Sequence, residues 1–302
     1  MKMKVFASPK IKQDEELIRE MHMTPTQQIW ARLCRSKVSV ASMIFLVLVV
    51  LAAIFANVLM DEALVTTQNT AIRMQPPSWE HWFGTDIYGR DLFARVLYGS
   101  RISLLIGIAT TVIATLIGCL LGAIAAYYGG IVDEVIMRVC DVFMAIPEQL
   151  LAICVVASMG ANAVSLIFAL VIAVIPPRTR LVRSTVLGII GSEYVEAAKA
   201  AGMKDLGIIM KEIMPNSLGP LIVNCTQGLA SIILTASSLS YLGVGIQPPT
   251  PEWGAIISAA REYLRIAPYM CILPGIVMVL VALAFCLLGD GLRDALDPRL
   301  KD

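Results

Sequence analysis

The sequence predicts an all-α membrane protein with six transmembrane helices. Its 302 residues are 57% hydrophobic and only 16% charged, whereas a soluble domain carries roughly a quarter charged residues. Several apolar runs reach about 20 residues, the length that a helix needs to cross the hydrocarbon core of a bilayer. The alternating apolar and polar pattern of a membrane barrel is missing, so we expect every span to be a helix.

Four of the predicted spans contain no charged residue: 38–60, 102–128, 218–246 and 269–288. The third and fourth spans, 135–158 and 163–181, are less regular. Charged residues and prolines interrupt them, namely Arg138, Asp141, Pro147 and Glu148 in the third span and Pro176, Pro177, Arg178 and Arg180 at the end of the fourth.

The distribution of basic residues predicts the orientation. An even number of spans puts both termini on one side, and eighteen Lys and Arg residues lie on that side against six on the other. Because basic residues accumulate in cytoplasmic loops, we expect both termini in the cytoplasm. The first apolar run is longer than a signal-peptide core and follows a charged tail, so we expect it to be retained.

These spans divide the chain into five segments. A cytoplasmic tail (1–37), which is either an amphipathic or a disordered arm, precedes the first helix (38–60) and an external segment (61–101) that is too short for an independent domain. A five-helix core (102–290) contains a long cytoplasmic loop (183–216), and a cytoplasmic tail (291–302) follows. In the second external segment, Tyr263, Leu264 and Ile266 predict a short helix at the membrane surface.

The long cytoplasmic loop predicts two short helices. Ser192 can cap the first, with Glu193 and Glu196 near its positive end. Its alanines form a thin surface that another protein can approach closely, and Gly202 ends it. The second helix covers 203–213 and is expected to end at Pro215, where the fifth span begins; Leu206, Ile209, Met210 and Ile213 would share one of its faces. The loop is either an ordinary connector or a docking element.

Three other groups of charged residues are candidates. Glu148 lies within the third span, where an ionisable residue marks either a functional site or a structural ion pair. Asp86 and Arg90, like Asp91 and Arg95, are four residues apart, and we expect each pair to bridge an exposed helix face at the external surface.

Several functions are excluded by what the sequence lacks. It has no phosphate-binding G-x-x-x-x-G-K-[ST] motif, so we expect no ATP on this chain. Its net charge of +1 gives no reason to expect nucleic acid as a partner. Its seven cysteines show no C-x-x-C spacing and its two histidines are far apart, so neither a disulfide framework nor a metal site is predicted. No catalytic constellation is present, and we expect no enzymatic activity.

The motifs of the loop resemble those of a known family. "EAAKAAG" (196–202) followed by "IMPN" (213–216) is similar to the loop of binding-protein-dependent ABC importer permeases, with Met214 where leucine is usual. Three further stretches resemble the second permease of the dipeptide/oligopeptide/nickel branch: "FGTDIYGRDLFARVLYGSRISLLIG" (83–107), "SYLGVGIQPPTPEWG" (240–254) and "LGDGLRDALDPRL" (288–300). The resemblance extends from about the first span to the end of the chain.

The resemblance implies the ABC importer permease fold and a complex in which several subunits have separate roles. A second homologous permease would complete the pathway, two ATPase subunits would bind ATP and Mg²⁺, and an extracytoplasmic binding protein would deliver the cargo. The helix from about residue 193 to 201 would be the coupling helix, seated in a groove on an ATPase subunit. Its coupling residues would be Glu193, Glu196, Ala197, Ala198 and Gly202.

The resemblance also implies a place and a cargo. The chain would lie in the cytoplasmic membrane of a prokaryote and help to import di- or oligopeptides, with nickel or a metal chelate as the alternative within the branch. A different class, an ion-coupled secondary transporter that uses Glu148, is the main rival, although the chain shows no internal repeat. A membrane scaffold without transport activity is the third possibility.

Overall fold

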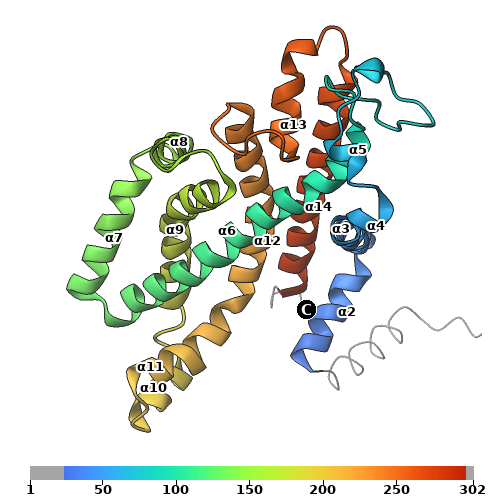
Figure 1. Ribbon diagram of the computed structural model, residues 1–302. Coiled ribbons are helices and arrows are strands. Elements are labelled where there is room, and N and C mark those ends of the chain that lie inside the picture. Colours follow the sequence, from blue (N-terminus) through green and yellow to red (C-terminus); the bar gives the residue numbers. More distant parts are fainter. Residues whose placement is uncertain (1–23, 297–302) are drawn as a thin grey trace, which may run out of the picture.

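The computed structural model describes residues 24–296, and the regular structure of this part is helical (Figure 1). Five of the described helices are long and apolar enough to cross a membrane, or six if one bent pair counts as a single span. The prediction of an all-α membrane protein is therefore confirmed, and the predicted number of six spans is reached when the bent pair counts as one span. The predicted N-terminal arm lies mostly outside the described residues.

The first span is shorter than predicted. Helix α2 (Pro25–Arg35) precedes α3 (Lys37–Ile54), and Ser36 separates them by accepting a hydrogen bond from the backbone N–H of Ser39. The predicted span 38–60 then breaks at Phe55 into the short helix α4 (Ala56–Leu59). Two further short helical segments follow, α5 (Ala63–Thr66) and η1 (Thr70–Ile72).

Helix α6 (Leu92–Tyr128) has 37 residues and begins ten residues before the predicted span. Its start is set by Asp91, whose carboxylate accepts a hydrogen bond of 2.7 Å from the N–H of Ala94. At about 1.5 Å per residue the helix is roughly 55 Å long, well beyond the hydrocarbon core of about 30 Å. Gly129, with φ of 62°, ends it.

The third and fourth spans differ from the prediction. Instead of one span at 135–158, the chain forms α7 (Gly130–Met144) and α8 (Glu148–Met159), bent by 84°. Pro147 precedes α8, and a proline disfavours the helical conformation of the residue before it. Helix α9 (Ala163–Leu187) continues six residues beyond its predicted end and contains Pro176 and Pro177.

The segment that was predicted as a second loop helix is continuous with the fifth span. Helix α10 (Glu193–Ala200) is separate, but α11 (Asp205–Ile208), a π-helical turn (Ile209–Ile213) and α12 (Met214–Tyr241) follow without a break. Pro215 therefore does not end a helix. It lies in the first turn after the π-helical residues, where the ladder of hydrogen bonds is already irregular.

The second external segment forms α13 (Trp253–Ala260) and the turn η3 (Arg261–Tyr263) before α14 (Tyr269–Leu296). At the place of the predicted surface helix the structure has only this 3₁₀ turn, with Leu264 and Ile266 exposed. The α-helix of the segment, α13, lies earlier, is largely buried and is capped by Glu252. Helices α10 and α13 lie at opposite ends of the molecule, which we call the α10 end and the α13 end (Figure 1). Separate apolar clusters hold the two ends, one joining α3, α6, α12, α13 and α14, the other joining α6, α9, α10 and α12.

Candidate functional site

The inner face of α10 is seated in the chain's own core. Val195 is fully buried and Ala198 is only 8% exposed. Both belong to an apolar cluster to which α6, α9 and the π-helical turn contribute. Close packing on this face fixes α10 relative to the long helices, so the two should move together as one body. The cluster partners are Ala123, Ala126, Val182, Val186, Ile208, Ile209, Ile213 and Leu221.

The outer face of α10 is exposed and thin. Glu193, Glu196 and Ala197 are exposed, as are Ala200 and Ala201. Of the five predicted coupling residues, the structure therefore places Glu193, Glu196, Ala197 and Gly202 at the surface. It places Ala198 against the chain itself, so Ala198 could act on a partner only through the position of the helix.

The two ends of α10 are formed differently. Ser192 is the N-cap residue of α10, as predicted, but its side chain makes no capping bond, because its hydroxyl donates to the carbonyl of Ile189 at 2.6 Å. The prediction for Gly202 is confirmed. It has φ of 75° and takes part in paired bonds from Gly202 N–H to Lys199 C=O and from Met203 N–H to Ala198 C=O. This pair is the Schellman motif that favours glycine.

Tyr127, at the end of α6, joins the loop to the long helices. Its hydroxyl donates to the carboxylate of Asp205 at 2.8 Å, and the ammonium of Lys199 lies 5.4 Å from its ring centre.

The common face that was expected for Leu206, Ile209, Met210 and Ile213 is wrong, because Leu206 and Met210 are exposed whereas Ile209 and Ile213 are buried. The π-helical turn changes the angular spacing of the side chains, so a regular helical period could not place them.

Two ion pairs attach α7 to α9. Asp133 accepts two hydrogen bonds from the guanidinium of Arg183, and Asp141 accepts one from Arg180. The two partners of each pair stand 50 and 39 residues apart in sequence, so helical spacing alone could not pair them. They link the bent helix pair to the helix that leads into α10.

A polar stripe runs along α12. We give this name to Asn224, Gln227, Ser231, Thr235 and Ser238, whose spacing of three or four residues puts them on one face. Ser231 and Ser238 are exposed, and the other three are half-buried. At membrane depth, polar side chains face other protein or water instead of lipid. Near the α10 end an open cavity of about 710 Å³ adjoins the stripe and is lined by Asn224, Gln227 and Arg293, among others.

Glu148 is the first residue of α8 and lies at the bend between α7 and α8. Its side chain is exposed on the surface of this chain. Helix α8 lies apart from α10 (Figure 1), so Glu148 and the predicted coupling residues do not form one site. Pro147 was the one sequence signal for the bend that exposes it.

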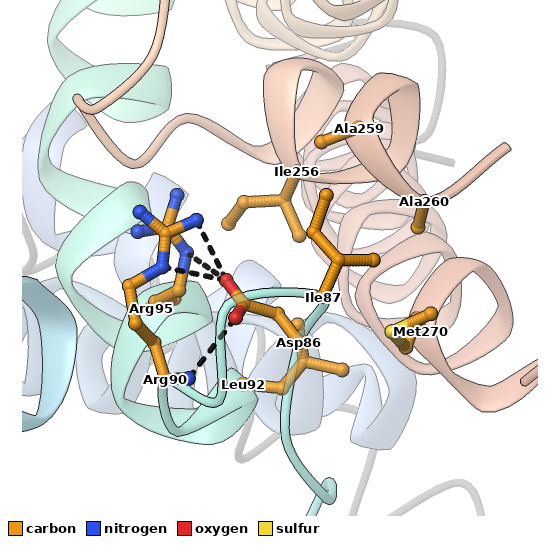
Figure 2. Close-up of a pocket in the computed structure, with 9 residues that line it drawn as sticks. All are labelled: Asp86, Ile87, Arg90, Leu92, Arg95, Ile256, Ala259, Ala260 and Met270. Carbon is orange, nitrogen blue, oxygen red and sulfur yellow. Dashed lines mark hydrogen bonds and ion pairs between the residues drawn. The ribbon is translucent and has the colours of Figure 1, made fainter. Parts of the chain in front are cut away.

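The α13 end holds a buried ionic cluster (Figure 2). Asp86 accepts hydrogen bonds of 2.7 Å from Arg90 Nε and 3.0 Å from Arg90 N–H, and Arg95 lies 3.5 Å from the same carboxylate. All three residues are at most 8% exposed. The predicted exposed helix face is therefore wrong: Asp86 and Arg90 precede α6 in a buried loop. Arg95 pairs with Asp86, because Asp91 caps α6 and binds His81 at 2.7 Å.

A second buried carboxylate fixes α13. Glu252 is fully buried and accepts hydrogen bonds from the backbone N–H groups of Gly254 and Ala255 at 3.0 and 2.9 Å. The hydroxyls of Ser103 on α6 and Ser237 on α12 approach the same carboxylate at 3.3 and 3.2 Å. One carboxylate therefore joins three helices at this end.

Comparisons with known proteins cover most of the chain. A family described as binding-protein-dependent transport system inner membrane component matches residues 118–302, and the N-terminal TM domain of oligopeptide transport permease C matches residues 24–77. A dipeptide transport system permease protein, DppC, from Alkalihalophilus pseudofirmus is 43% identical over 92% of this chain and 91% of its own. A glutathione transport system permease protein, GsiD, from Pectobacterium atrosepticum is 43% identical over 92% of each chain.

Solved structures share the fold. The chain resembles an inward-facing conformation of the MetNI methionine ABC transporter, with a TM-score of 0.57 and 18% identity over 68% of this chain and 98% of the other. It also resembles an amino acid ABC transporter crystallised with histidines, with a TM-score of 0.52 and 14% identity over 67% of this chain and 94% of the other.

Proposed function

The chain belongs to the family of inner-membrane components of binding-protein-dependent transport systems, the ABC importer permeases, and on this premise we propose that it forms half of the pathway of an ATP-driven peptide importer. A second, related permease forms the other half. The names of two relatives, for dipeptide and glutathione transport, support a short peptide as the cargo and do not favour nickel or a metal chelate.

The observation that carries the proposal is that α10 has one face packed into its own chain and one face open to a partner. Its inner face is packed into the long helices, and its outer face offers Glu193, Glu196 and Ala197 to a partner. A helix held in this way transmits a rigid-body movement from a partner to the spans. The partner is one of two ATPase subunits, which bind ATP and Mg²⁺, whereas this chain is a non-catalytic subunit without a cofactor.

The rest of the assembly follows from this arrangement. Helix α10 and both termini lie in the cytoplasm, and the α13 end faces the extracytoplasmic binding protein that delivers the peptide. The membrane is the cytoplasmic membrane of a prokaryote. The polar stripe of α12 faces the second permease across the pathway, and Glu148 is a further pathway residue exposed at the bend of α7 and α8.

Transport by the purified complex tests the proposal. The complete importer is reconstituted in proteoliposomes with its binding protein, and uptake of a radiolabelled dipeptide is measured. We expect ATP to drive uptake when the proton gradient is collapsed, and an imposed gradient without ATP to drive none. The opposite result would show an ion-coupled transporter and direct attention to Glu148. Uptake of Ni²⁺ without uptake of the dipeptide would contradict a peptide as the cargo.

A further inference from the structure

Arg178 on α9 is a buried cation for which residues 24–296 supply no counter-ion. Only 6% of the residue is exposed, and its Nη1 has no hydrogen-bond partner among the described residues. None of the ion pairs in that part of the chain includes it. A buried charge is strongly destabilising unless it is paired, so an acceptor from outside residues 24–296 would relieve Arg178.

Two glycines make room for this side chain. A Cβ atom at Gly228 on α12 would collide with Nη2 of Arg178, and one at Gly118 on α6 would lie 2.7 Å from its Cβ. Larger residues at either position would displace the arginine. The guanidinium therefore lies in a slot that is formed by the backbones of two neighbouring helices.

Gly228, which Arg178 contacts, lies on the face of α12 that carries the polar stripe. Gly228 follows Asn224 by four residues and precedes Ser231 and Thr235 by three and seven, so all four lie on one face of α12. Hydroxyl and amide groups therefore share the face of α12 that Arg178 reaches, together with Cys225 and Ile232. They can accept or donate hydrogen bonds, but they carry no negative charge that would neutralise the guanidinium.

We propose that Arg178 and the adjoining part of the polar stripe bind the free carboxylate of a peptide as it passes along α12. This inference rests on the proposed function and names a subsite of that pathway. A guanidinium binds a carboxylate through two parallel hydrogen bonds, which makes arginine well suited to this group. Because Arg178 is nearly covered by its own chain, the acceptor must be small and mobile. A peptide terminus meets that condition better than a side chain fixed in the second permease.

Thiol labelling of the complete importer tests the subsite. Ser231→Cys is introduced into a cysteine-free background, and its reaction rates with an anionic and a cationic methanethiosulfonate reagent are compared. Arg178 should favour the anionic reagent, and Arg178→Gln should lower the anionic-to-cationic rate ratio about tenfold. Arg178→Lys should retain most of the ratio. The matched control is Arg180→Gln, since Arg180 is exposed and paired with Asp141, and it should change the ratio little.

The ligand is tested in the same preparation without any change at Arg178. Dialanine at millimolar concentration should slow the labelling of Ser231→Cys, and dialanine amide should not. The subsite is overturned by an unreactive cysteine, by a rate ratio that does not depend on Arg178, or by equal protection from both peptides. Loss of the second permease from the purified Arg178→Gln complex would assign the acceptor to that subunit and also overturn it. The proposed function is tested separately by uptake of dialanine through the wild-type importer: uptake supports a peptide importer, and no uptake contradicts it.

Discussion

Tryptophan substitutions on the two faces of α10 distinguish an effect on ATPase docking from an effect on the stability of the chain. Ala197 is exposed, whereas its neighbour Ala198 is 8% exposed and belongs to the cluster with Val195 and Ile213. Ala197→Trp adds bulk where we place the ATPase groove. Ala198→Trp adds the same bulk inside the chain. The two variants are therefore matched in chemistry and differ only in direction.

The magnitudes follow from packing. Extra volume in a close-packed site costs about 1–3 kcal/mol. At Ala198 this is lost from the stability of the chain, and we expect the apparent Tm of the complex to fall by on the order of 5 °C. At Ala197 the Tm should stay within about 1 °C, because exposed substitutions rarely change stability by more than about 0.5 kcal/mol. The same 1–3 kcal/mol then weakens ATPase docking by roughly 5- to 150-fold.

The assay measures three quantities in detergent: the apparent Tm, the ATPase subunits retained per permease, and the stimulation of ATP hydrolysis by loaded binding protein. Ala197→Trp should lose retention and stimulation at normal Tm. Lys199→Ala, which removes an exposed cation near Tyr127, serves as the milder control. If Ala197→Trp kept full retention, stimulation and transport, the outer face would not be a docking surface and the loop would be a connector.

Three other experiments have expected outcomes. Gly202→Val should weaken ATPase retention, because a β-branched residue in the left-handed conformation costs about 1–2 kcal/mol; wild-type retention would show that the Schellman turn is dispensable. Glu252→Ala should lower the apparent Tm more than Glu252→Gln, since loss of an N-cap costs about 0.5–2 kcal/mol; equal values would argue against the capping role. Cysteines at Gln68 and Ser192 should test orientation: an impermeant thiol reagent on intact cells should label only the first, and the reverse pattern would invert the topology.

The sequence predicted what depends on composition and on single residues. Long apolar runs identified the spans, and Gly202 marked the end of α10 because only glycine adopts that conformation easily. The residues at which helices begin were harder to predict from the sequence. Helix α6 begins at its cap, Asp91, and not where the apolar run begins, because hydropathy measures contact with lipid instead of helix formation.

Side-chain directions were the hardest to predict. In α10 both faces carry alanine, so the sequence could not show that Ala198 faces the core and Ala197 faces out. The buried cluster around Asp86 was missed for a related reason. Charged residues four apart fit an exposed helix, and only tertiary contacts with α13 and α14 reveal that they are buried in a loop.

Helix α6 joins both ends of the molecule along one rod that lies obliquely in the bundle (Figure 1). At the α13 end Arg95 ties it to Asp86, and at the α10 end Tyr127 ties it to Asp205. A rigid rod of about 55 Å that pivots at its middle by only 5° would carry each end about 2.4 Å, in opposite directions. Such a see-saw needs no chain of small rearrangements between the two faces of the membrane. A docking event at one end and a swing of α10 at the other would be a single motion, and a break in α6 between them would disconnect the two.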